Sequence, residues 1–148
     1  MIKETCGIFL VSNDKILCCL PFGSRIGEKL SIPKGLKNDG EKPFEAALRE
    51  FEEETGYSLI NKIIDLQTQN KEVEIKTLPQ SKYRNNEKVL VSFVVKITED
   101  LTNEKLVCNS YFYKEGKEYP EIAEFYWFTF SEAKNKLHPT QAKLIDLI

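Results

Sequence analysis

Apolar positions divide the chain into segments with two different periods. Residues 3–11 and 15–20 are rich in β-branched and other apolar side chains, and a polar turn at residues 12–14 separates them. This pattern predicts a β-hairpin. Residues 88–98 contain a nearly continuous apolar run, which is typical of a strand buried on both faces. We therefore expect this later strand near the centre of a sheet.

A helical period replaces the β pattern in residues 43–55. One stripe of side chains falls within about 40° on a helical wheel. Its members are Phe44, Leu48, Phe51 and Thr55. Pro43 suits the first turn of a helix, and Gly56 can adopt the left-handed conformation that ends one. The sequence thus predicts a short helix with fixed ends and one buried face.

The remaining β-rich segments indicate more strands of a mixed sheet. They are residues 57–66, 71–78 and 124–130. Residues 99–120 are the least regular, and their aromatic side chains either cover a binding cleft or pack against the body. We expect one α+β domain spanning residues 1–148.

Two helices are predicted near the end of the sequence, over residues 131–137 and 139–147. Thr129 and Glu132 have the spacing of a capping box at the start of the first. His138, the only histidine, lies between the two helices. We interpret it as a turn residue rather than a general base, because no neighbouring residue would orient or activate it.

The helix predicted over residues 43–55 carries three carboxylates away from its buried stripe. Glu50, Glu53 and Glu54 gather in a sector about 100° wide. Like charges at this spacing repel, and the helix dipole disfavours anions near a C-terminus. Mg²⁺ and Mn²⁺ prefer such oxygen ligands, so a divalent cation would relieve the repulsion. The alternative is an ordinary solvated acidic helix, although the sharp helix ends favour a fixed site.

The acidic helix belongs to a longer motif that begins at Gly35. The stretch from Gly35 to Tyr57 reads GLKNDGEKPFEAALREFEEETGY. It resembles the Nudix box, G-x5-E-x7-R-E-U-x-E-E-x-G-U, in which U is a bulky apolar residue. Every fixed position matches, although Phe51 and Tyr57 are aromatic where the family usually has Leu, Ile or Val. Residues 31–35 are similar to the strand and PKG turn before the box in many members, whereas Leu30 stands where many of those have Trp.

This resemblance implies the Nudix fold, an α/β/α sandwich with a mixed central sheet. It also implies that a metal-activated water hydrolyses a nucleoside diphosphate linked to another group. The cofactor would be Mg²⁺, with Mn²⁺ as an alternative. Its implied ligands are Glu50, Glu53, Glu54 and the backbone carbonyl of Lys34. One of the three carboxylates could instead act as the general base.

Other residues have supporting roles under the same resemblance. The structural positions of the motif are Gly35, Glu41 and Gly56. Arg49 is expected to pair with Glu41, to orient the ligand carboxylates and to join Glu50 and Glu53 in the catalytic set. Members of the family differ in where a further acidic ligand enters. Here Glu121 or Glu124 is the candidate, and Glu124 is taken as the metal ligand.

Substrate contacts are expected outside the box. Lys82, Tyr83 and Arg84 place two cations around an aromatic ring in the polar segment 79–87, a composition suited to phosphate binding and base stacking. A solvated loop tip is the alternative. Arg25 is either a phosphate contact or a solvated arginine.

The substrate class rests on the PKG turn, which is similar to that of dinucleoside polyphosphate hydrolases and of enzymes acting on RNA 5′ ends. We favour a dinucleoside polyphosphate or a related nucleoside diphosphate derivative, with nucleoside triphosphates and ADP-ribose as alternatives. The competing class is a Nudix-fold sensor that binds nucleotide without hydrolysing it. Its usual marks are degraded box carboxylates and an appended DNA-binding segment, and this sequence shows neither.

Composition and charge limit the kinds of binding partner that the sequence predicts. The chain has 148 residues, 41% apolar, and a net charge of −2, so no bulk field attracts nucleic acid. The four cysteines lack zinc-binding spacing and are interpreted as reduced packing residues. No apolar run has the length of a signal sequence or a membrane span, so we expect a cytoplasmic protein with a small nucleotide-derived substrate. The oligomeric state stays open, and a homodimer is one alternative.

Overall fold

The computed structural model describes residues 2–25, 27–84 and 87–148. Residues 26, 85 and 86 of two predicted loops lie outside this description. The strands are β1 (Lys3–Ser12), β2 (Lys15–Pro21), β3 (Lys34–Leu36), β4 (Val73–Thr77), β5 (Ser81–Lys82), β6 (Lys88–Ile97), β7 (Tyr111–Lys114), β8 (Lys117–Pro120) and β9 (Ile122–Thr129). The helices are α1 (Pro43–Thr55), α2 (Leu59–Thr68), α3 (Phe130–Lys136) and α4 (Pro139–Ala142), with a 3-10 turn over Ile145–Leu147.

A mixed sheet of seven strands forms the centre of the fold. Its main path runs β4-β6-β1-β2-β9, while β3 also pairs with β1 and β5 with β6. Strands β1 and β6 are parallel, and the other pairs are antiparallel. The predicted hairpin is confirmed, because Asn13 and Asp14 turn between β1 and β2 with φ of 52° and 58°. The predicted central strand is confirmed as well, since β6 lies between β4 and β1.

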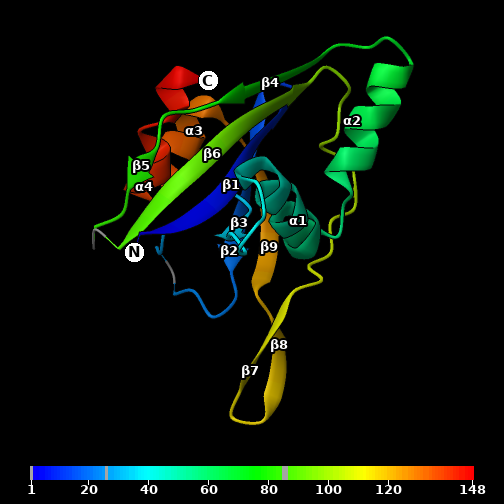
Figure 1. Cartoon of the computed structure of the whole chain (residues 1–148). Coiled ribbons are helices and arrows are strands. Elements are labelled where there is room, and N and C mark those ends of the chain that lie inside the picture. Colours follow the sequence, from blue (N-terminus) through cyan, green and yellow to red (C-terminus); the bar gives the residue numbers. More distant parts are fainter. Residues whose placement is uncertain (1, 26, 85–86) are drawn as a thin grey trace.

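Helices cover both faces of this sheet (Figure 1). Alternate residues of β1 point to opposite sides. Ile8 and Leu10 therefore join one core with Phe51 of α1, and α2 packs into the same core. Phe9 and Val11 join a second core beneath α3 and the C-terminal turns. This arrangement is the expected α/β/α sandwich with a mixed central sheet.

Helix α2 corrects the strand predicted for residues 57–66. The Ser58 hydroxyl accepts a hydrogen bond from the Asn61 N–H at 3.4 Å and caps the helix. Leu59, Ile63 and Leu66 are buried, a spacing of four and then three residues that places them on one helix face. The prediction was wrong because it weighted the β-branched content of this segment above its helical period and its serine cap. The next predicted strand, residues 71–78, is confirmed as the shorter β4.

The C-terminal helices are close to their predicted positions. The capping box at the start of α3 is confirmed: the Thr129 hydroxyl accepts from the Glu132 N–H, and the Glu132 carboxylate accepts from the Thr129 N–H. The helix predicted over residues 139–147 is shorter than expected. It ends as α4 at Ala142, and a 3-10 turn follows.

Residues 99–120, predicted to be irregular, contain an additional hairpin. Strands β7 and β8 pair across a turn in which Glu115 and Gly116 have φ of 52° and 76°. The hairpin projects from the body (Figure 1). Tyr119 stacks on Phe22 with ring centroids 4.9 Å apart, so part of the aromatic content packs at the base of the hairpin. Tyr113 on the other strand is 76% exposed.

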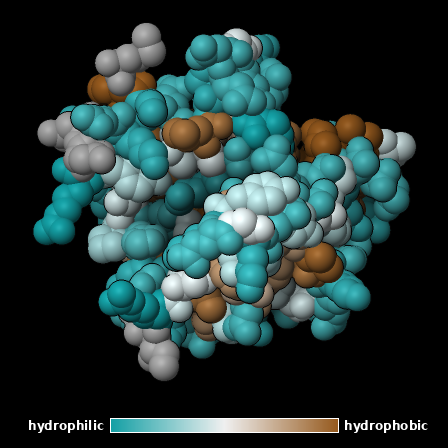
Figure 2. Space-filling model, turned by 90° about the horizontal axis from the view of Figure 1, so that it is seen from below, coloured by the Kyte–Doolittle hydropathy of each residue, from teal (hydrophilic) through white to brown (hydrophobic). Residues whose placement is uncertain are grey.

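The surface seen from below is mainly hydrophilic, and its apolar side chains lie in separate patches (Figure 2). None of the described helices combines the length and apolar character needed to cross a membrane. All four cysteines are buried and free, as expected for packing residues.

Replacing Phe51 with alanine should destabilise the fold. The ring is fully buried between α1 and the sheet, and truncation of a buried aromatic typically costs about 3–5 kcal/mol. Glu52→Ala, at an exposed position of the same helix, is the control and should change the free energy of unfolding by less than about 0.5 kcal/mol. Urea denaturation in EDTA measures both. Equal stability of the two variants would contradict this packing.

Candidate active site

The segment before α1 lies against the helix because Gly35 has no side chain. A Cβ built on Gly35 would lie 2.0 Å from Cδ of Glu50. Such a separation is far below van der Waals contact, so a side chain at position 35 would displace the Glu50 carboxylate from this place. The Glu50 carboxylate therefore packs directly on the β3 backbone.

Arg49 joins the loop to the acidic face of the helix. Its Nε and Nη2 donate to the two Glu41 carboxylate oxygens at 2.7 and 3.1 Å, and Nη2 also donates to the Leu36 carbonyl at 3.0 Å. Its Nη1 donates to Glu50 at 2.9 Å and to Glu53 at 3.2 Å. The bonds from Arg49 lower the pKa of Glu41 to about 2, and they raise the pKa of Arg49. One guanidinium thus holds two of the three clustered carboxylates.

Glu54 is the buried member of the cluster. Only 7% of the residue is exposed, and one carboxylate oxygen accepts a hydrogen bond from the Lys34 backbone N–H at 3.0 Å. Burial raises the pKa of Glu54 from its ordinary 4.5 to about 8, and it also raises the pKa of Glu50. The helical wheel places Glu54 away from the core stripe, but β3 covers that side of α1. The buried residues of the helix therefore span a wider arc than the predicted stripe, and they are Ala46, Ala47, Phe51, Glu54 and Thr55.

The backbone of Lys34 is turned toward this carboxylate. The Ile8 N–H donates to the Pro33 carbonyl at 3.2 Å, and hydrogen-bonded pairs alternate along an antiparallel ladder. Gly7 lies opposite Lys34 in this register, so the N–H and C=O of Lys34 both point away from β1. The N–H meets Glu54. The Lys34 carbonyl lies on the same side as this N–H and therefore takes no part in the β1–β3 hydrogen bonds.

The cluster suits a divalent cation in its chemistry, although its side chains are not gathered into a metal cage. Among the described residues, no three His, Cys, Asp or Glu side chains converge in a metal-binding arrangement. Arg49 draws Glu50 and Glu53 toward itself instead. A buried carboxylate such as Glu54 is costly without a compensating cation, and carboxylate oxygens are the donors that Mg²⁺ and Mn²⁺ prefer. The donor set therefore fits the ion implied by the sequence.

The two candidate acids near the start of β9 lie in different surroundings. The charge of Glu121 adds to the effect of burial in raising the pKa of both Glu50 and Glu54. Glu124 is exposed, and its carboxylate accepts a hydrogen bond from the Tyr126 hydroxyl. The electrostatics of the cluster therefore include Glu121.

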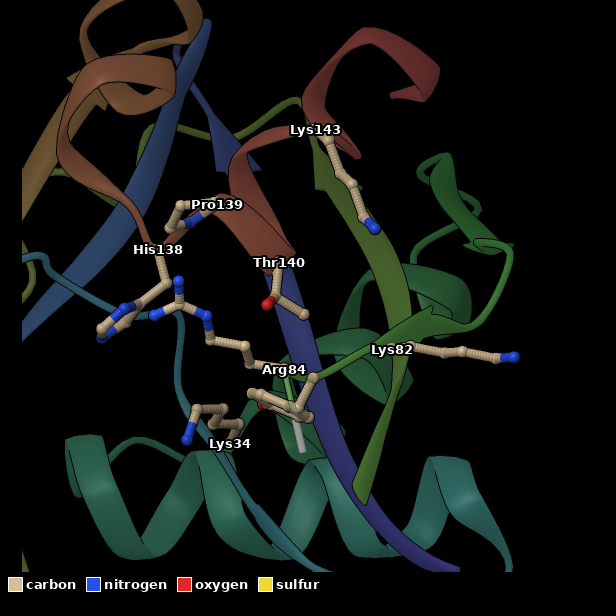
Figure 3. Close-up of a pocket in the computed structure, with 8 residues that line it drawn as sticks. Lys34, Lys82, Arg84, His138, Pro139, Thr140 and Lys143 are labelled. Carbon is tan, nitrogen blue, oxygen red and sulfur yellow. The ribbon is translucent and has the colours of Figure 1, made fainter. Parts of the chain in front are cut away.

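A basic pocket of about 750 Å³ adjoins the cluster through Lys34 (Figure 3). It is lined by Lys34, Lys82, Tyr83, Arg84, His138, Pro139, Thr140 and Lys143. The two walls come from the β5 region and from α4, and the Ser81 Oγ joins them by donating to the Thr140 carbonyl at 2.7 Å. Four of the lining residues are lysine or arginine and none is acidic. The pocket therefore presents positive charge to an anionic ligand.

The predicted substrate residues divide between two places. Lys82, Tyr83 and Arg84 all line the basic pocket. The Arg84 guanidinium points toward His138, whereas the Lys82 ammonium points away from that group (Figure 3). Arg25 lies apart, in a separate hollow of about 430 Å³. The structure therefore does not bring Arg25 together with the other three residues.

The pocket also contains residues that sequence reasoning did not assign to a site. His138 lies at the turn that begins α4, as interpreted from the sequence, yet it faces the pocket together with Thr140 and Lys143. Burial, and then the charge of Lys34, lower the pKa of His138. No local pattern marks these residues, because this wall of the pocket exists only where α4 meets β5.

The whole chain, residues 1–148, matches the family model described as NUDIX domain. The chain belongs to the Nudix family of pyrophosphohydrolases. Among solved structures it resembles dihydroneopterin triphosphate pyrophosphohydrolase from E. coli, with a TM-score of 0.69, 10% identity and coverage of 100% of this chain and 97% of that chain. It also resembles an Ap4A hydrolase binary complex from C. elegans, with a TM-score of 0.66, 14% identity and coverage of 98% and 93%. At these identities the likeness shows the fold, and no curated protein matches the chain.

Metal-free stability should fall as the pH rises, because Glu54 titrates differently in the two states. The folded protein keeps the Glu54 proton up to about pH 8, whereas the unfolded chain releases it near pH 4.5. The unfolded state therefore binds fewer protons between these values, and stability decreases across that window. Glu54→Gln should remove this part of the decrease and be more stable than the parent at pH 8 in EDTA, by about 1–3 kcal/mol.

Urea denaturation at pH 5 and pH 8 measures this difference. Added Mn²⁺ or Mg²⁺ should raise the melting temperature of the parent at pH 8 by ligand linkage, and Glu54→Gln should weaken that response. Parallel pH curves for both proteins in EDTA would contradict the titration of Glu54. A melting temperature that does not change with millimolar metal would contradict the proposed cation site.

Proposed function

We propose that this protein is a divalent-metal-dependent pyrophosphohydrolase whose active site is the carboxylate cluster of α1. The observation that carries the proposal is the buried Glu54 carboxylate, which accepts from the Lys34 N–H and forms no ion pair with a described side chain. In this assignment Glu50, Glu54 and the Lys34 carbonyl hold Mg²⁺ or Mn²⁺, and Glu53 is the carboxylate of the implied ligand set that acts as general base instead. The further acidic ligand stays a prediction, with Glu124 as the sequence candidate. The effect of Glu121 on the cluster favours Glu121.

The residues of the cluster divide the chemical work. Arg49 holds Glu50 and Glu53, whose side chains are 14% and 43% exposed. Glu53 is the more open to water, and we assign it to accept a proton from the attacking water molecule. The new P–O bond forms to that oxygen as the bridging P–O bond breaks, and the electrons leave with the departing phosphate oxygen. A bound divalent cation supplies charge neutralisation and a lower pKa for its water.

The basic pocket supports a substrate with several phosphates. Lys34 contributes its backbone to the carboxylate cluster and its side chain to the pocket, so one substrate could occupy both. Arg84 and Lys143 provide charge further along the pocket, and guanidinium geometry suits phosphate oxygens. We therefore favour a dinucleoside polyphosphate or a related nucleoside diphosphate derivative.

A substrate panel in Mg²⁺ and in Mn²⁺ tests the proposal directly. It should include dinucleoside polyphosphates, nucleoside triphosphates, ADP-ribose and 5′-triphosphorylated RNA, with products separated by chromatography. Tight nucleotide binding without turnover of any of them would favour the alternative, a nucleotide sensor with the Nudix fold. The cytoplasmic location expected from the sequence stays a prediction.

Glu54→Gln should abolish most activity while the protein remains folded. The amide keeps an oxygen that can accept from the Lys34 N–H, but it loses the charge that would hold a cation. We expect kcat to fall by about 100-fold or more in Mg²⁺. Glu52→Gln, exposed on the same helix, is the matched control and should retain normal kcat. A Glu54→Gln enzyme with near-normal kcat would remove Glu54 from the metal site.

Replacing both Lys82 and Arg84 with alanine should weaken binding of long polyphosphate substrates selectively. The two residues line the pocket, and loss of charge-assisted contacts should raise KM by about tenfold or more for substrates with distal phosphates. Short substrates should be affected less, and Lys117→Ala on the projecting hairpin should have no effect. Steady-state kinetics on substrates of increasing phosphate number makes the comparison. If the double variant affected every substrate equally, or affected none, the interpretation of both residues as part of a solvated loop would be favoured.

A further inference from the structure

Strand β4 is an edge of the main sheet, and within the described part of the chain β6 is the only strand that pairs with it. Four of its five residues are exposed, and the fifth, Val73, is half-buried. An exposed edge presents unpaired N–H and C=O groups that can pair with another strand. We propose that β4 pairs antiparallel with β4 of a second copy of this chain, so that the protein forms a two-fold symmetric dimer.

The hydrogen bonds to β6 determine which groups of β4 are free. The Leu78 N–H donates to the Ser92 carbonyl at 3.0 Å, and this pair continues the β4–β6 register. Hydrogen-bonded pairs alternate along an antiparallel ladder, so Lys76 and Glu74 bond to β6. The backbone groups of the residues between and beside them point away from β6. These outward-facing residues are Val73, Ile75 and Thr77.

If a two-fold axis passes through Ile75, the outward-facing backbone groups of one β4 strand pair with the same groups of the second copy. Ile75 then lies opposite its own copy, and Val73 lies opposite Thr77 of the partner subunit. The three pairs are all of the hydrogen-bonded type and give about six backbone hydrogen bonds. Ile75 is 41% exposed in the single chain, so the axis also covers an apolar side chain. An isologous contact of this kind closes after two copies.

The same axis matches the charges of the strand. Glu74 falls opposite Lys76 of the partner subunit, and Lys76 falls opposite the partner's Glu74. Both contacts are of the non-hydrogen-bonded type, in which facing side chains are closest. The opposite edge of the sheet offers no such match, because Glu124 is the only charged residue of β9. Charge and hydrogen-bond register thus select β4 and a second copy as its occupant.

Charge reversal provides the test, and it needs no enzymatic activity. Sedimentation equilibrium of the full chain, from micromolar to near-millimolar concentration, should show a dimer. Glu74→Lys and Lys76→Glu each replace two attractive contacts with two repulsive ones, so each should weaken the dimer about tenfold or more. An equal mixture of the two variants restores every contact and should associate more tightly than either alone. The double variant Glu74→Lys/Lys76→Glu should dimerise like the parent.

Melting curves distinguish a variant that no longer dimerises from a variant that no longer folds. Glu74 also faces Lys96 within the chain, so Glu74→Lys could lower the melting temperature, whereas Lys76 faces Val94 and its reversal adds no like-charge contact there. Lys76→Glu therefore tests the interface even if Glu74→Lys, and with it the double variant, is unstable. A parent chain that stays monomeric overturns the proposal. A dimer unaffected by Lys76→Glu, or a folded mixture that gains no affinity, overturns it equally.

Discussion

The contact between β3 and α1 at Gly35 is the constraint on which the site depends. Because position 35 has no side chain, the β3 backbone can lie on the Glu50 carboxylate. This closeness brings the Lys34 N–H to Glu54 and the Leu36 carbonyl to Arg49. Three successive residues of β3 therefore make three separate contacts with one helix. The loop and the helix behave as one unit, and neither would hold this geometry alone.

The unit joins two regions of opposite charge. On one side Glu50, Glu53 and Glu54 concentrate negative charge, and on the other the pocket concentrates positive charge. Lys34 takes part in both, since its backbone bonds to Glu54 while its side chain lines the pocket. Burial lowers the pKa of Lys34, and the charge of Glu54 opposes that shift. A ligand with a phosphate chain and a bound cation matches this division of charge.

Features built from residues close together in the sequence were easier to predict than features built from distant segments. Helix α1, its caps and the carboxylates lie within one short segment, so periodicity and spacing were enough to predict them. The capping box at Thr129 is equally local. Helix α2 was also within reach, because Ser58 and the spacing of Leu59 and Ile63 were present in the sequence. There the β-branched composition was given too much weight.

Other features could not be predicted because distant segments create them. The burial of Glu54 depends on β3, twenty residues earlier in the chain, and a helical wheel contains no information about that cover. The C-terminal wall of the pocket depends on the bond between Ser81 and Thr140, fifty-nine residues apart. His138 faces the pocket for the same reason. Basic residues near position 83 could be noticed, but their partners could not.

The bond between Ser81 and Thr140 also implies an order in which parts of the protein form during synthesis. The box is translated before β6, and β1 gains its parallel partner only when β6 emerges. The second wall of the pocket comes later still, with α4. A nascent chain long enough to contain β6 but not α4 includes every segment of the carboxylate cluster, but it lacks one wall of the pocket. On the ribosome, the segments that form the carboxylate cluster are therefore complete before the second wall of the basic pocket emerges.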